Sequence, residues 1–238
     1  MKEFTPKKIL FVVFSFLILQ LSVFAVESPF VVVVSAEEMV DDGMRVIIKR
    51  AVNEANKGAL ALILEVDTPG GLVDSAIDIT NDLLTAKCPT VAYIKGMGAI
   101  SAGALISYAC KHIVMAPGSN IGASAPIILG ETQPNNELNE KTKSFLRSRY
   151  RTLAEVNGHN SLLAEAMVDI NVEVWALKMP NGKYEFFPSK AEALKFIEDM
   201  KEGKKLAPNE EKGRDFVRGT PVTGDCQIVF ISEKGGEE

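Results

Sequence analysis

The sequence has few of the residues that build metal and redox sites. It contains three cysteines and two histidines among 238 residues. Cys88, Cys110 and Cys226 lack the short paired spacing of metal ligands, and an odd number of thiols cannot all pair with one another. Cys110 lies in an apolar helical pattern and is most simply a small core residue. We therefore predict no metal, no cofactor and no redox role.

A clustered basic surface is also missing. The net charge is -5, and the acidic and basic residues are scattered rather than gathered in blocks. Nucleic-acid binding is therefore not indicated. No internal repeat is present, which argues against a solenoid. With 47% hydrophobic and 24% charged residues, the chain is long and balanced enough for one main folded domain with a sizeable core.

The one long hydrophobic run stands at the N-terminus. Lys2, Lys7 and Lys8 precede an apolar stretch over residues 9–24, and Ala25 ends a small-residue cleavage pattern. This order is typical of an export signal, so we assign residues 1–25 to a signal peptide and expect a protein outside the cytoplasm. Retention as an uncleaved membrane anchor is the alternative, although a relaxed span needs about 20 apolar residues.

Short apolar segments then alternate with helical patterns. Because the segments are β-branched and continuous, we expect strands that are buried on both faces. Helices that are apolar on one side separate them, which predicts an α/β domain with a mostly parallel sheet. The predicted strands are 29–34, 60–66, 90–94 and 112–116, and the predicted helices are 37–56, 72–86 and 101–110.

The second half of the chain is less regular. A polar stretch over 130–141 precedes a predicted helix at 142–156 and a shorter one at 162–168. Beyond these, short strand patterns at 174–177, 184–187 and 227–231 flank a charged helix at 191–201. We expect the main domain to cover 26–173 and residues 174–238 to form a peripheral α+β segment.

Three glycine-bearing runs follow predicted strands, where α/β folds place their sites. In Asp67-Thr68-Pro69-Gly70-Gly71, two glycines let backbone N–H groups approach a ligand, which suits an oxyanion hole, although a plain tight turn is the alternative. In the run 96–103, Ser101 begins a helix of small residues and is either a nucleophile or an N-cap. The run 116–124 suits the lining of an extended peptide.

The three runs in register resemble the membrane-bound serine proteases of the NfeD type, relatives of the Clp protease subunit and of signal peptide peptidase A. The resemblance covers about residues 30–170. It implies a Clp protease/crotonase-like fold, Ser101 as the nucleophile, an oxyanion hole from Gly70, Gly71 and the Ala102 N–H, and a substrate-binding turn at Gly122. It also implies a catalytic lysine after that turn. Longer members continue into membrane helices and a small β-barrel, so the chain resembles a shortened form.

A serine hydroxyl needs a general base to take its proton, and the sequence offers few candidate bases. His112 begins a predicted buried strand and is interpreted as structural, and His159 is interpreted as a solvated loop residue. In Clp relatives a histidine aligns with residues 123–125, where this chain has none. A Ser–Lys dyad remains, in which burial supplies a neutral amine. Alignment with the family places it at Lys141, while Lys143, about 200° round a helix, is the alternative.

We therefore expect an exported or membrane-associated serine endopeptidase that cleaves apolar segments of membrane proteins. By analogy with the family, its partners are stomatin-like, and relatives of this fold generally form homo-oligomers. A signal-peptide-peptidase-like hydrolase and a non-catalytic peptide-binding scaffold of the same fold remain open. A crotonase-type acyl-CoA enzyme is disfavoured, because acyl-CoA is cytoplasmic.

Overall fold

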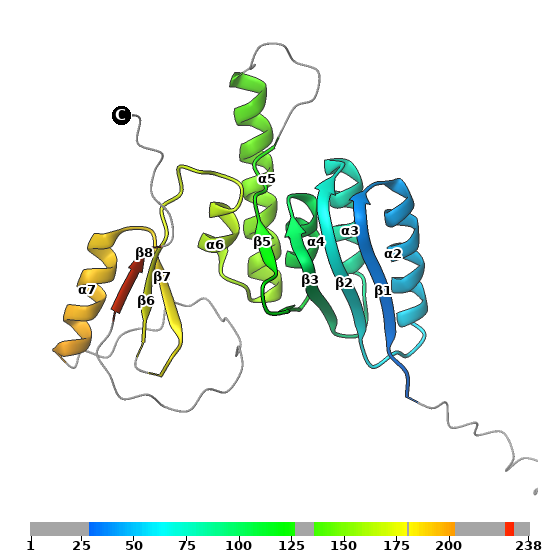
Figure 1. Cartoon of the computed structure of the whole chain (residues 1–238), viewed down its shortest axis with the longest axis horizontal. Helices are drawn as coiled ribbons and strands as arrows, with labels where there is room; N and C mark the ends of the chain where they lie inside the picture. Colours follow the sequence, from blue (N-terminus) through cyan, green and yellow to red (C-terminus); the bar gives the residue numbers. More distant parts are fainter. Residues whose placement is uncertain (1–28, 127–135, 180, 203–226, 231–238) are drawn as a thin grey trace, which may run out of the picture. The chain divides into compact units, whose positions relative to one another are not determined.

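A mostly parallel sheet forms the larger part of the structure (Figure 1). The computed structural model describes residues 29–126, 136–179, 181–202 and 227–230, so the predicted signal segment 1–25 lies outside the described residues. The strand order is β1-β2-β3-β4, and β5 pairs in parallel with the end of β3. The strands are β1 (Val32–Val40), β2 (Leu62–Gly71), β3 (Thr90–Ile100), β4 (His112–Met115) and β5 (Asn120–Gly122).

Helices cover one face of this sheet (Figure 1). They are α2 (Asp42–Ala55), α3 (Val73–Leu83) and α4 (Ala102–Tyr108). Right-handed crossovers that always step in the same direction place every connecting helix on the same side. Leu62 and Leu64 are consequently buried, whereas Val33 on the other face is 59% exposed. The prediction of strands buried on both faces was therefore wrong for these strands.

Two predicted boundaries also differ. Residues 37–40, predicted as helix, continue β1 through an irregularity at Glu38, whose φ of 66° is left-handed. The helix begins only after Asp41, whose carboxylate accepts a hydrogen bond from the Met44 N–H at 2.9 Å. Near the end of β3, the predicted turn at 96–98 lies within the strand as an irregularity, with φ of 57° at Gly96 and 122° at Gly98, where the register with β2 shifts. Pairing with β5 begins at Gly98.

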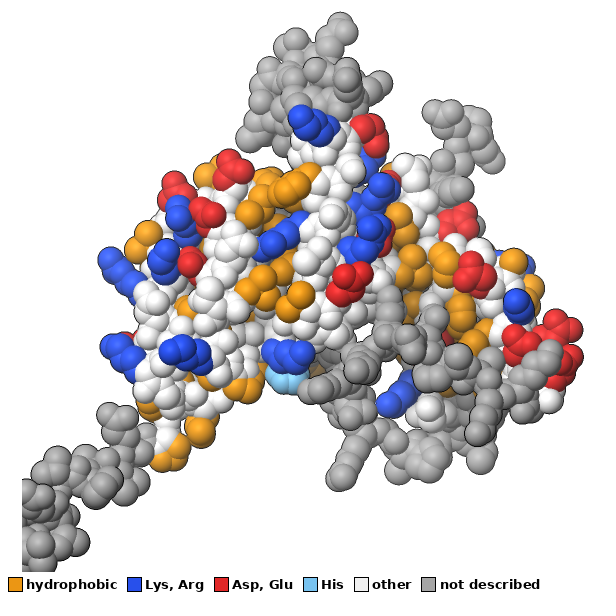
Figure 2. Space-filling model, turned by 180° about the vertical axis from the view of Figure 1, so that it is seen from behind, with side chains coloured by type: hydrophobic (Ala, Val, Ile, Leu, Met, Phe, Trp, Pro, Cys, Tyr) orange, Lys and Arg blue, Asp and Glu red, His pale blue; other side chains and the backbone are white. Residues whose placement is uncertain are grey.

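Helix α5 (Asn136–Asn157) lies beside α4, and α6 (Ser161–Ala166) follows it. Helix α5 starts at Asn136, six residues before the predicted start at position 142. Its buried side carries Leu146, Tyr150 and Leu153. Figure 2 shows the helical face, where hydrophobic side chains gather between the helices and basic side chains follow α5.

The remaining elements form a small antiparallel sheet in the order β7-β6-β8, with α7 beside it. Leu177, Phe187 and Ala193 form its buried cluster. The bounds are β6 (Trp175–Lys178), β7 (Tyr184–Phe187), α7 (Lys190–Lys201) and β8 (Gln227–Phe230). Within the described ranges, no helix has the length and hydrophobicity needed to cross a bilayer.

Candidate active site

Ser101 sits at a sharp turn between β3 and α4. Its backbone has φ 53° and ψ −116°, a conformation that is rare for a residue with a side chain. It occupies the N-cap position of α4, but its side chain makes no capping hydrogen bond. Ser101 is therefore the N-cap of α4 by position, as one interpretation predicted, but its side chain does not cap the helix. A strained, partly buried serine at a strand-to-helix turn, whose hydroxyl makes no hydrogen bond among the described residues, has the arrangement of a nucleophile elbow.

The end of β2 packs directly against this serine. A Cβ at Gly70 would lie 2.7 Å from the Cβ of Ser101 and 3.2 Å from its Oγ. Gly70 also has φ 104°, which disfavours any other residue. Position 70 must therefore be glycine for the Ser101 hydroxyl to have room.

The backbone donors around Ser101 are not equivalent. The Gly70 N–H already donates to Thr68 Oγ1 at 3.1 Å, and the Thr68 hydroxyl donates in turn to the carbonyl of Glu38. The Ala102 N–H belongs to the first residue of α4, where an N–H has no partner within its own helix. Of the predicted oxyanion-hole residues, Gly70 therefore has its N–H engaged within the turn, whereas the Ala102 N–H is left available by its helix. Gly71 pairs with Val40 of β1.

The peptide groups of Ser101 are fixed from both sides. Its N–H donates to the Gly122 carbonyl at 2.8 Å, which places the predicted substrate-binding glycine beside the nucleophile. Its carbonyl accepts from Ala104 N at 3.0 Å and lies 3.2 Å from Ser124 Oγ and 3.3 Å from the Tyr150 hydroxyl. Sequence analysis missed both hydroxyls.

An apolar pocket of about 220 Å³ lies beside the end of β5. Ala123 follows Gly122 directly, and Ser124 N donates to the Met167 carbonyl at 2.8 Å, so the pocket adjoins the strand that holds Ser101. Its lining is formed by Ala123, Ala125, Ala166, Met167, Val168, Ile170 and Val172. A pocket of this kind can accept an apolar side chain.

Neither histidine belongs to this group. His112 begins β4, at the opposite end of the strands from Ser101, and is exposed rather than buried as predicted. His159 is half-buried against Tyr108 and pairs with the Cys110 carbonyl at 2.8 Å, so its interpretation as a solvated residue was wrong.

Burial raises the pKa of Cys110 to about 12, which keeps its thiol protonated.

The lysines lie on different faces of α5. Because Tyr150 reaches the Ser101 carbonyl, it marks the face of α5 that meets the elbow. At about 100° per residue, Lys143 lies within about 20° of Tyr150, whereas Lys141 lies about 180° away. Lys141 is exposed, and Lys143 is 20% exposed and pairs with Glu140 at 2.6 Å. Among the described contacts, none joins either lysine to Ser101.

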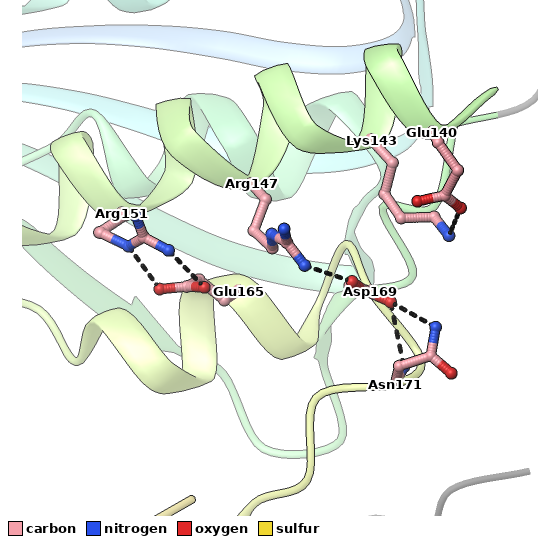
Figure 3. A network of polar contacts seen from close by, with 7 residues as sticks. All are labelled: Glu140, Lys143, Arg147, Arg151, Glu165, Asp169 and Asn171. Carbon is pink, nitrogen blue, oxygen red and sulfur yellow. Dashed lines mark hydrogen bonds and ion pairs between the residues drawn. The ribbon is translucent and has the colours of Figure 1, made fainter. Parts of the chain in front are cut away.

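Ionic contacts join α5 to the pocket wall (Figure 3). Arg147 Nη1 lies 2.6 Å from Asp169 Oδ2, and Asp169 Oδ1 accepts two hydrogen bonds from Asn171 at 3.1 Å each. These bonds and the positive charges of Lys143 and Arg147 outweigh desolvation and lower the pKa of Asp169. The contacts fix the pocket-lining segment 167–172.

Over the described residues, no cluster of His, Cys, Asp and Glu could hold a metal.

Comparison with known proteins relates most of this structure to one family. The family model described as NfeD1b, N-terminal domain, matches residues 30–206. Membrane protein NfeD1b of Bacillus subtilis (strain 168) is 33% identical over 157 residues, covering 66% of this chain and 35% of that protein. Membrane-bound protease PH1510 of Pyrococcus horikoshii is 36% identical over 114 residues, covering 46% and 26%. The chain thus spans about a third or less of these relatives.

Two solved structures named 1510-N membrane-bound stomatin-specific protease are also similar. Both are 29% identical to this chain, with a TM-score of 0.53. One is a serine-to-alanine mutant and covers 59% of this chain and 70% of its own. The other is a lysine-to-alanine mutant in complex with a substrate peptide and covers 60% and 67%. These matches confirm the predicted Clp-protease-like α/β fold.

Proposed function

Because the chain belongs to the NfeD1b N-terminal-domain family, we propose that it is an exported, membrane-associated serine endopeptidase with Ser101 as its nucleophile. The elbow carries this proposal: Ser101 has a left-handed backbone, a hydroxyl with no hydrogen bond among the described contacts and a glycine packed against it. A serine that only capped α4 would use its hydroxyl for that purpose. Similarity to a membrane-bound protease supports the same reaction class.

The chemistry follows from the groups around the elbow. Ser101 Oγ attacks the carbonyl carbon of a peptide bond, and its proton passes to a lysine amine. The N–H groups of Gly71 and Ala102 stabilise the resulting oxyanion. The intermediate then collapses to an ester on Ser101 as the lysine returns the proton to the departing amine. Water, activated by the same lysine, hydrolyses the ester and restores the hydroxyl.

The base comes from the first turns of α5. In the related protease the substituted serine and lysine are 41 residues apart, whereas Lys141 and Lys143 follow Ser101 by 40 and 42 residues. We assign Lys141, as the resemblance implies, which requires the start of α5 to unwind so that this side chain reaches Ser101. Lys143 is the rival, because it already lies on the face marked by Tyr150 but pairs with Glu140.

The substrate proposed is an extended apolar segment of a membrane protein. The pocket beside Gly122 offers an apolar site within a few residues of the nucleophile. The related proteases are named as stomatin-specific, so a stomatin-like partner is the first candidate. The relatives NfeD1b and PH1510 are named as a membrane protein and a membrane-bound protease, which supports action at a membrane. We further propose that the chain assembles as a homo-oligomer.

Labelling of the full chain with a fluorophosphonate probe tests the reaction class. The probe should attach to the wild-type protein and not to Ser101→Ala, which should also lose hydrolysis of an apolar peptide. Ser189→Ala is the matched control, because Ser189 caps α7 through the Glu192 N–H and lies outside the three glycine-bearing runs. A folded wild-type protein that is not labelled would favour the non-catalytic scaffold.

A further inference from the structure

Two buried hydroxyls lie behind the nucleophile, on the carbonyl of Ser101. Tyr150 and Ser124 are 1% and 5% exposed, and their hydroxyl oxygens are 2.7 Å apart. Both also lie within hydrogen-bond distance of the Ser101 carbonyl oxygen. They come from α5 and from the segment after β5, so three separate parts of the chain meet at this one peptide group.

The Tyr150 and Ser124 hydroxyls carry one proton each, so only two donor–acceptor patterns are possible when they bond to each other. If Tyr150 donates to Ser124, the Ser124 proton can bond to the Ser101 carbonyl; if Ser124 donates to Tyr150, the Tyr150 proton can. One hydroxyl proton is therefore available to that carbonyl in either case. Burial raises the pKa of Tyr150, so its proton is retained throughout the working pH range.

The carbonyl of Ser101 and the N–H of Ala102 belong to the same peptide unit. A trans peptide is planar, so its C=O and N–H point in opposite directions and cannot turn independently. A hydrogen bond that fixes the carbonyl therefore also fixes the N–H that the oxyanion hole uses. The left-handed backbone of Ser101 makes such support necessary, because that conformation is unfavourable by itself.

We propose that Tyr150 and Ser124 are positioning residues that orient the Ala102 N–H for oxyanion binding by holding the carbonyl of the Ser101–Ala102 peptide. The role rests on the proposed serine peptidase function. It differs from the role of the catalytic groups, because neither hydroxyl needs to touch the substrate. It also links the base to the nucleophile, since α5 carries both Tyr150 and the lysines.

Single and double variants of the full chain test this assignment. In Tyr150→Phe the Ser124 hydroxyl can still donate to Ser101, and in Ser124→Ala the Tyr150 hydroxyl can, so each single variant should slow fluorophosphonate labelling only about two- to threefold. The double variant has no hydroxyl donor left, so the carbonyl keeps only the helix N–H donors of Ala104 at 3.0 Å and Leu105 at 3.4 Å. It should lose more than the product of the two single effects, about tenfold or more. In peptide hydrolysis the loss should fall on kcat, with KM unchanged.

Tyr108→Phe is the matched control, because its buried ring packs on Tyr150 with centroids 5.6 Å apart but makes no described contact with the Ser101 carbonyl. Thermal melting confirms that each variant is folded. The amide NMR signal of Ala102 should shift in the double variant and not in Tyr108→Phe. If the wild-type protein is labelled and the double variant is labelled equally fast, the positioning role is wrong and the peptidase proposal stands. If the wild type is neither labelled nor active, the peptidase proposal fails, and an unshifted Ala102 signal would independently overturn the positioning role.

Discussion

Helices α4 and α5 both border Ser101, but they are held in place in different ways. All seven residues of α4 are buried, and most have small side chains. A Cβ at Gly103 would lie 2.4 Å from Thr68 Cγ2, so the helix rests directly on β2. Helix α5 is long and charged, and it meets the core along one stripe. Packing therefore fixes the proposed nucleophile closely, whereas the position of the proposed base depends on where α5 begins.

The largest expected effect concerns α5. If Lys141 is the base, Lys141→Ala should lower kcat by about 10²–10⁴-fold, the usual contribution of a general base. Lys143→Ala should then remain active within a fewfold, and Lys141→Arg should fail, because a guanidinium does not release its proton. Rates on an apolar peptide measure this. The opposite result, with Lys143→Ala inactive, would show that α5 keeps its present first turns during catalysis.

The next largest effect is expected at Gly70, which packs on Ser101 at the start of α4. Gly70→Ala places a methyl group 2.7 Å from the Cβ of Ser101, and the displaced hydroxyl should lower kcat about a hundredfold. Gly58→Ala is the control, because Gly58 has φ 118° but nothing within 4 Å of its added Cβ. Both variants should lose about 1–2 kcal/mol of stability from backbone strain. Equal activities of the two would contradict the close packing on Ser101.

A smaller effect is expected where α5 meets the pocket wall. Asp169→Asn keeps the shape of the side chain but removes the charge that pairs with Arg147. The segment 167–172 should loosen, so KM for an apolar peptide should rise about fivefold, equivalent to about 1 kcal/mol, with the labelling rate unchanged. Arg151→Gln breaks an ion pair to Glu165 outside the pocket lining and should leave KM unaltered. A fall in labelling rate with constant KM would show that the segment does not act on substrate binding.

The smallest effect concerns the far ends of the two helices, where His159 packs on Tyr108. Burial, together with the nearby charges of Lys111 and His112, lowers the pKa of His159 below its ordinary value of 6.5. Folding therefore favours the neutral ring, and this stabilisation is complete above pH 6.5 and is lost as the pH falls through the lowered pKa. The melting temperature should drop between pH 7.5 and pH 5 by a few degrees more in the wild type than in His159→Gln. Parallel curves would mean that His159 contributes nothing.

The sequence signals on the Ser101 side are local, because strand ends, glycines and small residues can be recognised without tertiary contacts. They led to the predictions of Gly70, Gly71, Ser101 and Ala102, and the structure brings Gly70 and Ser101 together. The engagement of the Gly70 N–H was not predictable, because it depends on a hydrogen bond to Thr68 within the turn.

The α5 side was harder to predict. The start of α5 follows a polar stretch without a clear capping signal, and a shift of six residues changes which lysine faces the elbow. The pairing of Tyr150 with Ser124 depends on tertiary contact across 26 positions. A hint was present, since Tyr150 falls on the buried stripe with Leu146 and Leu153, and a buried tyrosine hydroxyl usually finds a partner.

The left-handed backbone of Ser101 also restricts which chemistry evolution or engineering can place at this turn. Three side chains commonly serve as nucleophiles of this kind, namely those of serine, cysteine and threonine. Threonine carries a second substituent on Cβ, and a β-branched residue at φ 53° is strongly disfavoured. Serine hydrolases on this backbone could therefore be converted to thiol enzymes by a single exchange, whereas a threonine enzyme would need a different turn.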